Sequence, residues 1–167
     1  MKRIGFGQVE PNHLSAKRTG QIYAQLPADS SIKVLENGMF VKYDYAAGKV
    51  NLDGVGEWML VLNEVKLYDD AWRVSYKDFA MLPDNREEMY PRVMKTNVGD
   101  IFTTNCLIKA GAKGVETDMG NTITEGAVLV PDATGYLKVG TGDMEWKVVK
   151  IYTMPDGQEG VKIQRIK

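Results

Sequence analysis

The stretch IKVLENGMFVKYDY, residues 32–45, determines the fold class that we predict for this chain. Its Asn37-Gly38 dipeptide is typical of tight turns whose central residues take positive φ, and it predicts a hairpin. After the turn, apolar side chains alternate with polar ones over residues 39–45, which is the period of a strand with one buried face. The stretch therefore predicts two antiparallel strands joined by a turn.

Short apolar runs separated by turn residues continue along most of the chain. EWMLVLNEVKLY (57–68) is apolar on both faces, which is typical of a central strand. The second half carries the runs PRVMKT, DIFTTNCLI, AVLVP, GYLKV and MEWKVVKIYTM, and a last hairpin through PDGQEG to VKIQRIK. The predicted fold is mainly β, a small antiparallel barrel or sandwich, with one short helix and an extended N-terminal arm.

The helix is predicted over residues 69–82, where apolar side chains recur with helical rather than strand spacing. The residues that show this spacing are Trp72, Tyr76, Phe79 and Ala80. Pro83 would end the helix, and the charged segment 83–91 is expected to form an exposed loop. We therefore expect an arm over residues 1–31 and a β domain over residues 32–167, which can divide into lobes 32–82 and 91–167.

Two segments of the β domain resemble each other. ENGMFVKYDYAAGKV (36–50) and TEGAVLVPDATGYLKV (124–139) share a glycine, an apolar run, an aspartate six residues after that glycine, and a further glycine three or four residues later. Each would form a strand followed by a tight turn. Such a match arises either from an internal duplication or by chance in a glycine-rich β protein, and the sequence leaves both open.

The N-terminal arm has no regular apolar period, yet apolar side chains are spaced along it. Burial of these side chains alone does not offset the conformational entropy lost when such a segment is ordered. The arm therefore needs backbone hydrogen bonds as well, as when a strand adds to a sheet edge, from its own chain or a neighbour. Our candidate interface residues are Phe6, Val9, Pro11, His13, Leu14, Ile22, Tyr23 and Leu26.

Composition argues against several classes of protein. The net charge is −1, with 21 basic and 22 acidic residues, so no basic face for nucleic acid is expected. With one cysteine, Cys106, and one histidine, His13, the sequence offers no disulfide framework, no cysteine-rich metal site and no implied cofactor. Common catalytic and phosphate-binding motifs are missing, so we predict no enzyme. No apolar run has the length of a membrane span, and the N-terminus is no signal peptide, so synthesis in the cytoplasm is expected.

Three segments resemble virion proteins of tailed bacteriophages. They are GFGQVEPNHLSAKRTGQIYAQLPA, ENGMFVKYDYAAGKVNLDGVGEWMLVLNEVKLY and YPRVMKTNVGDIFTTN. The resemblance is to decoration (cement) or minor capsid proteins, which are small and mostly β with an extended N-terminal arm. It implies a protein of the virion surface that binds the major capsid protein and copies of itself, often as a trimer, and strengthens the shell. Removal of residues 1–28 would then leave a folded domain that no longer binds shells.

Two other functions remain open from the sequence. The first is a head–tail connector or a tail component, which differs from a decoration protein in copy number. The second belongs to another class, a carbohydrate- or ligand-binding β module, in which Trp58, Trp72 or Trp146 would stack on a sugar.

Overall fold

The computed structural model describes residues 7–23, 26–63, 80–81, 90–108, 119–155 and 157–167. In these residues the chain is mainly β, and the helix present is α1 (Ser15–Thr19). The strands, in chain order, are β1 (Val9–His13), β2 (Ile22–Tyr23), β3 (Leu35–Glu36), β4 (Phe40–Asp44), β5 (Lys49–Asn51), β6 (Trp58–Val61), β7 (Ala80–Met81), β8 (Val93–Met94), β9 (Ile101–Thr104), β10 (Val128–Pro131), β11 (Leu137–Val139), β12 (Trp146–Thr153) and β13 (Glu159–Arg165).

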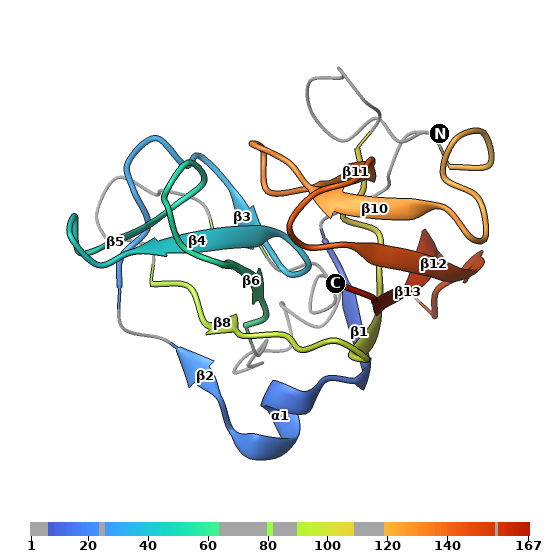
Figure 1. Ribbon diagram of the computed structural model, residues 1–167, viewed down its shortest axis with the longest axis horizontal. Coiled ribbons are helices and arrows are strands. Elements are labelled where there is room, and N and C mark those ends of the chain that lie inside the picture. Colours follow the sequence, from blue (N-terminus) through green and yellow to red (C-terminus); the bar gives the residue numbers. More distant parts are fainter. Residues whose placement is uncertain (1–6, 24–25, 64–79, 82–89, 109–118, 156) are drawn as a thin grey trace, which may run out of the picture.

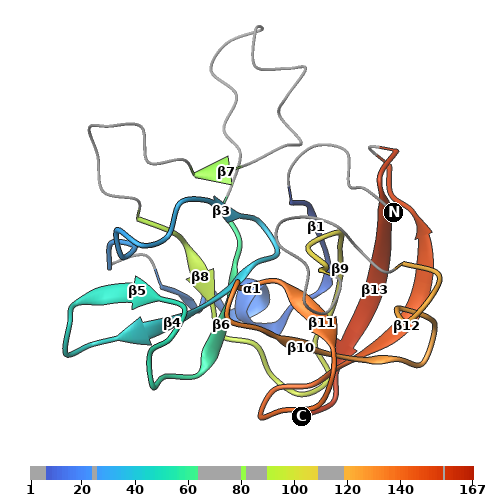
Figure 2. The same ribbon diagram turned by 90° about the horizontal axis from the view of Figure 1, so that it is seen from above.

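Most of the strands belong to two antiparallel sheets, which lie side by side in Figures 1 and 2. The first has five strands in the order β2-β8-β6-β4-β5, and the second has six in the order β1-β9-β13-β12-β10-β11. Strands β3 and β7 pair separately. Neither sheet closes into a barrel within the described part of the chain. The predicted mainly β fold is therefore confirmed, and the sandwich alternative fits it.

Five strands of the second sheet repeat the topology of the first. We number the five strands of the first sheet, and the five strands of the second sheet other than β1, from 1 to 5 in chain order. Both sheets then have the spatial order 1-5-4-2-3, and neighbouring strands are antiparallel in every pair. In this repeat β2 corresponds to β9, the hairpin β4–β5 to β10–β11, β6 to β12 and β8 to β13. Strand β1 is outside the repeat, because it adds to the outer edge of β9.

Hydrogen bonds outside the regular ladders repeat in the same way. In the first sheet the N–H of Gly38 donates to the carbonyl of Val61 at 2.9 Å, and the N–H of Val61 donates to the carbonyl of Met39 at 2.8 Å. The second sheet has Gly126 N to Val148 O (2.8 Å) and Val148 N to Ala127 O (2.8 Å). Single parallel bridges also correspond, between Ala28 and Val50 and between Leu107 and Leu137. Within the described residues, the chain therefore contains two copies of one five-stranded unit, whose strands lie between residues 22 and 94 and between residues 101 and 165.

The sequence match between residues 36–50 and 124–139 is part of this repeat. Its first glycines, Gly38 and Gly126, have φ values of 96° and 86°. Its aspartates both accept from a backbone N–H in the turn that follows, Asp44 from Ala47 at 3.0 Å and Asp132 from Thr134 at 2.8 Å. The second glycines, Gly48 and Gly135, also have positive φ. The shared residues are thus the ones that make equivalent turns.

The hairpin predicted across Asn37-Gly38 is wrong, although the turn itself exists. The N–H of Met39 donates to the carbonyl of Glu36 at 3.2 Å, and Gly38 has the predicted positive φ. The strands on either side do not pair with each other, since β3 pairs with β7 whereas β4 lies between β5 and β6. A Cβ on Gly38 would lie against Thr104 and Cys106 of the second unit. Glycine therefore lets the turn pack closely against that unit while the chain passes from one sheet to another.

The helix predicted over residues 69–82 lies mostly outside the described residues. Its end is wrong, because Ala80–Met81 form β7 and pair with Leu35–Glu36. Periodicity could not reveal this backbone pairing, because it depends on a strand more than forty residues away. The predicted loop 83–91 also falls largely outside the described residues.

Strand β4 lies between two hydrophobic cores. Phe40 belongs to the larger core, which also contains side chains from both units and the arm. Its ring centroid lies 5.7 Å from that of Trp146 and 6.3 Å from that of Phe102. Val41 and Tyr43 belong to a second core that lies mainly in the first unit. The predicted alternation holds over Met39, Val41 and Tyr43, which are buried, whereas Lys42 and Asp44 on the other face are half-buried and belong to neither core. Phe40 on that other face enters the larger core, and Tyr45 at the end of the pattern is exposed.

Candidate functional site

The N-terminal arm is bound by its own chain through backbone pairing. Strand β1 adds to the edge of the second sheet, with Val9 opposite Thr104 and Glu10 opposite Thr103. After α1, the arm continues into β2, which pairs with β8 at the edge of the first sheet. The arm therefore contacts both units, as its place in Figure 1 shows, and obtains the backbone hydrogen bonds that its sequence was predicted to require.

The buried carboxylate of Asp100 anchors the segment between β1 and β2, which contains α1. Asp100, which precedes β9, accepts from the N–H of Ser15 at 3.0 Å and from its hydroxyl at 2.9 Å. The same carboxylate accepts from the N–H of Asn97 at 2.9 Å. Because α1 has no side-chain cap of its own, Asp100 takes the place of a capping residue. No local sequence signal identifies this role, since Asp100 is 85 residues from Ser15.

The eight candidate interface residues occupy different environments. Val9 is half-buried against the larger core and Leu14 lies within it, only 2% exposed. Pro11 and His13 are exposed on β1, and Leu26 packs against the second core. Ile22 and Tyr23 form β2, and Phe6 lies outside the described residues. Pro11 and His13 are thus the two whose side chains the structure places on the surface.

Leu14 and Ala16 also change the expectation for a truncated protein. Both are buried in the larger core, and β2 is a strand of the first sheet. Removal of residues 1–28 would therefore take away core side chains and a strand. The expectation that this truncation leaves an intact β domain does not agree with the structure.

Strand β1 forms a polar network with the second sheet. The hydroxyl of Tyr152 donates to the carboxylate of Glu10 and lies 2.8 Å from the hydroxyl of Thr103. Thr103 donates in turn to the side-chain oxygen of Asn12 at 2.8 Å. Burial of the phenol, and then its hydrogen bond to Glu10, raises the pKa of Tyr152 from its ordinary value of 10.0. This network holds the arm in place at its exposed side.

The cysteine and the histidine lie in different environments. Cys106 is fully buried, and its Sγ donates to the carbonyl oxygen of Asn37 at 3.1 Å. His13 is exposed on β1. Among the interactions of the described residues, none is recorded between Cys106 and His13.

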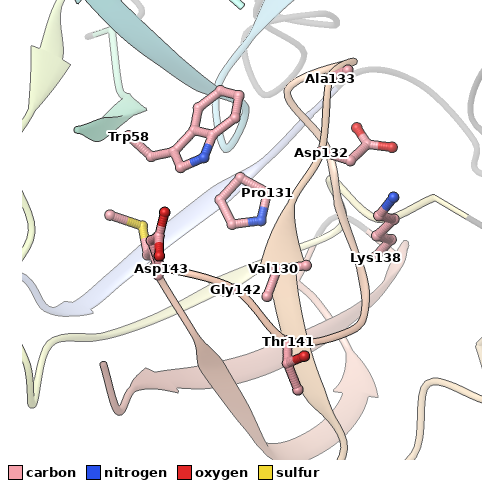
Figure 3. Close-up of a pocket in the computed structure, with 10 residues that line it drawn as sticks. Trp58, Val130, Pro131, Asp132, Ala133, Lys138, Thr141, Gly142 and Asp143 are labelled. Atoms are coloured by element: carbon pink, nitrogen blue, oxygen red, sulfur yellow. The ribbon is translucent and has the colours of Figure 1, made fainter. Parts of the chain in front are cut away.

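A pocket of about 290 Å³ lies where the two units meet. Trp58 comes from β6 of the first unit, and the remaining lining residues come from the second unit. They are Val130, Pro131, Asp132, Ala133, Lys138, Thr141, Gly142, Asp143 and Met144. Figure 3 shows the Trp58 indole beside Pro131, with Asp132 and Lys138 on the β10–β11 hairpin and Asp143 on the loop before β12.

Sequence reasoning included Trp58 among aromatic side chains that could stack on a sugar, and the structure places it in this pocket. Trp146 is fully buried in the larger core, so it is not available to a ligand. Trp72 lies outside the described residues. Among the other lining residues, Val130, Lys138 and Met144 lie in runs that were expected to form strands, and their position beside Trp58 depends on the packing of the two units.

The described residues contain no group of three or more His, Cys, Asp or Glu side chains that could hold a metal ion. Among the same residues, no helix is long and apolar enough to span a membrane. No protein-family model matches the chain, and no curated protein or solved structure matches it at the significance we required.

Proposed function

We propose that this protein is a structural component of a bacteriophage virion that binds the assembled capsid shell and stabilises it. The three segments that resemble decoration and minor capsid proteins support this proposal, and so does the mainly β fold. Its partners would be the major capsid protein and further copies of this chain.

The observation that carries the proposal is the position of β1. This strand is the outermost of the six-stranded sheet, and Pro11, Asn12 and His13 are exposed on it. Pro11 suits an edge position, because it offers no N–H to a further strand. We therefore expect side chains on this surface, rather than a further strand pairing, to make contacts between subunits.

The buried part of the arm has a different role in this proposal. Leu14 and the Ser15–Asp100 contact hold the arm on its own chain, so that β1 is already ordered before a partner binds. A surface that is ordered in advance loses less conformational entropy on binding. The arm would then act as a rigid contact surface rather than as a free strap.

The direct test is cryo-electron microscopy of particles reconstituted from shells that lack this protein, with the copy number measured. We expect density over the shell surface in many copies. A small ring of copies at one vertex would instead support the alternative of a head–tail connector or tail component. Absence of the protein from both places would overturn the proposal.

Variants of β1 test which surface makes the contact. We expect His13→Glu combined with Pro11→Asp to weaken co-sedimentation with shells, because charges would enter a contact region. Val55→Glu is the matched control, since Val55 is fully exposed in the loop before β6. Equal loss of binding by the control and the β1 variant would contradict the role of β1.

A further inference from the structure

The pocket between the two units has one aromatic wall whose orientation is fixed. Trp58 is half-buried and packs against the larger core. It stands opposite Lys42 in the β4–β6 pair, and the Lys42 ammonium lies 4.6 Å from the ring centroid. This cation–π contact and the core packing restrict the ring to one position. The indole therefore supplies an ordered apolar surface, as walls of ligand pockets commonly do.

The other walls carry polar groups that have no protein partner. Within the described residues, the side chains of Lys138, Thr141 and Asp143 make no hydrogen bond or ion pair, although all three line the pocket. Lys138 and Asp143 carry opposite charges but do not pair with each other. The pocket thus offers a donor, an acceptor and a hydroxyl that can serve as either.

One glycine, Gly142, lines the pocket. The GTG segment, residues 140–142, passes close to Val130, and a Cβ on Gly142 would lie 3.5 Å from a methyl group of Val130. The segment is held by Lys167, which donates to the carbonyl of Gly142 at 2.7 Å, and by Glu145, which accepts from the N–H of Gly142 at 3.1 Å. Because Gly142 has no side chain, this position leaves space in the pocket.

These features favour one chemical class of ligand. Asp132 and Asp143 would repel an anion such as phosphate, and Lys138 would repel a metal cation. A neutral polyhydroxylated ring can place its C–H face on the indole while its hydroxyl groups both donate to Asp143 and accept from Lys138. The volume is just below the lower limit of common ligand pockets, about 300 Å³, which suits one or two rings.

We propose that the pocket between the two units binds a neutral saccharide, with Trp58 as the stacking surface and Lys138, Thr141 and Asp143 as hydrogen-bonding groups. The site uses no residue of the arm, so it does not depend on the virion function proposed above. A virion protein that carries it would contact neutral glycans in addition to the shell.

The test is a titration of the full-length protein with maltohexaose, cellohexaose and chitohexaose, followed by tryptophan fluorescence and by isothermal titration calorimetry. We expect saturable binding of at least one of them. Asp143→Ala and Lys138→Met should each weaken that binding about five- to tenfold, since each removes one hydrogen-bonding group. Gly142→Leu should abolish it, because the new side chain would occupy the pocket without removing any polar group.

Two controls separate this proposal from the virion function. Asp53→Ala, at an exposed position outside the pocket, should bind the saccharide as the unchanged protein does. The β1 variant His13→Glu, Pro11→Asp should also keep saccharide binding, whereas the pocket variants should keep shell binding. No binding of any of the three oligosaccharides at millimolar concentration would overturn the proposal. Binding that the pocket variants leave unchanged would overturn it as well.

Discussion

The carboxylate of Asp100 holds Ser15 through two hydrogen bonds, to its N–H at 3.0 Å and to its hydroxyl at 2.9 Å. Asp100 lies in the segment that joins the two units, and Ser15 begins the helix of the arm. The buried side chain of Asp100 thus connects the arm to the segment between the two units. This contact explains how a segment with few apolar side chains is held in a defined place.

We predict that Asp100→Ala lowers the free energy of unfolding by about 1–3 kcal/mol in total, because the donors are only partly buried and water can replace part of the contact. The donors affected are the N–H groups of Ser15 and Asn97 and the Ser15 hydroxyl. Chemical denaturation followed by circular dichroism measures the change. Asp53→Ala, at an exposed position, should change the stability by less than about 0.5 kcal/mol. An Asp100 variant as stable as this control would show that the contact does not hold the arm.

Gly7→Ala is expected to release the start of the arm. A Cβ at residue 7 would lie 2.5 Å from the Sγ of Cys106 and would also meet the carbonyl oxygen of Asn37, and both atoms are buried. Neither can move without disturbing the second core. Faster amide exchange over β1 and faster tryptic cleavage after Lys17 or Arg18 would report the release. Gly20→Ala is a useful comparison, because a Cβ there meets no atom, although its positive φ causes strain. If Gly7→Ala leaves exchange over β1 unchanged, the close approach is not required.

Phe40→Ala should destabilise both units together. Phe40 comes from the first unit but packs against Phe102 and Trp146 of the second. Removal of a buried phenylalanine side chain costs about 3–5 kcal/mol. Because the core is shared, we expect one cooperative unfolding transition at a lower denaturant concentration, in both tryptophan fluorescence and circular dichroism. Val139→Ala, at a partly exposed site, should have little effect. Two separate transitions, of which only one moves, would contradict a shared core.

Stability at alkaline pH should depend on Tyr152. Its pKa is raised in the folded protein, so the neutral phenol is the form that folding favours. The contribution is therefore fully present below the unfolded value of about 10 and is lost as the pH rises through the higher folded value. We expect Tyr152→Phe to reduce the loss of stability above pH 10. Absorbance titration of tyrosinate in the two proteins identifies the group, and identical titration curves would exclude this assignment.

Part of the fold could be predicted from local patterns. The alternation after Gly38, the apolar character of β6 on both faces and the last hairpin through PDGQEG all predict strands that the structure contains. The shared glycines and aspartates of residues 36–50 and 124–139 predicted equivalent turns, whereas the sequence alone left open whether they belong to a repeat. These features depend on side-chain period and turn chemistry, which act over a few residues.

The candidate sites could be predicted only in part. The need of the arm for backbone hydrogen bonds followed from its composition, whereas the anchoring role of Asp100 had no sequence signal. Trp58 was one of three tryptophans considered for ligand binding. The sequence could not show that Trp58 lines a pocket whereas Trp146 is fully buried. Lys138, Thr141 and Asp143 are close in sequence, and they lie beside Trp58 only because this part of the second unit packs next to β6.

The sequence by itself determined the mainly β class, most of the strands of residues 32–167, several turns and the need of the arm for backbone partners. The tertiary structure alone decided that β3 pairs with β7 rather than with β4, that β1 adds to the edge of β9, and that the two units share the core around Phe40. The physical reason is the range of the interactions. Side-chain period and turn conformation are local, whereas the choice of a strand's partner depends on which distant edge allows the largest shared burial.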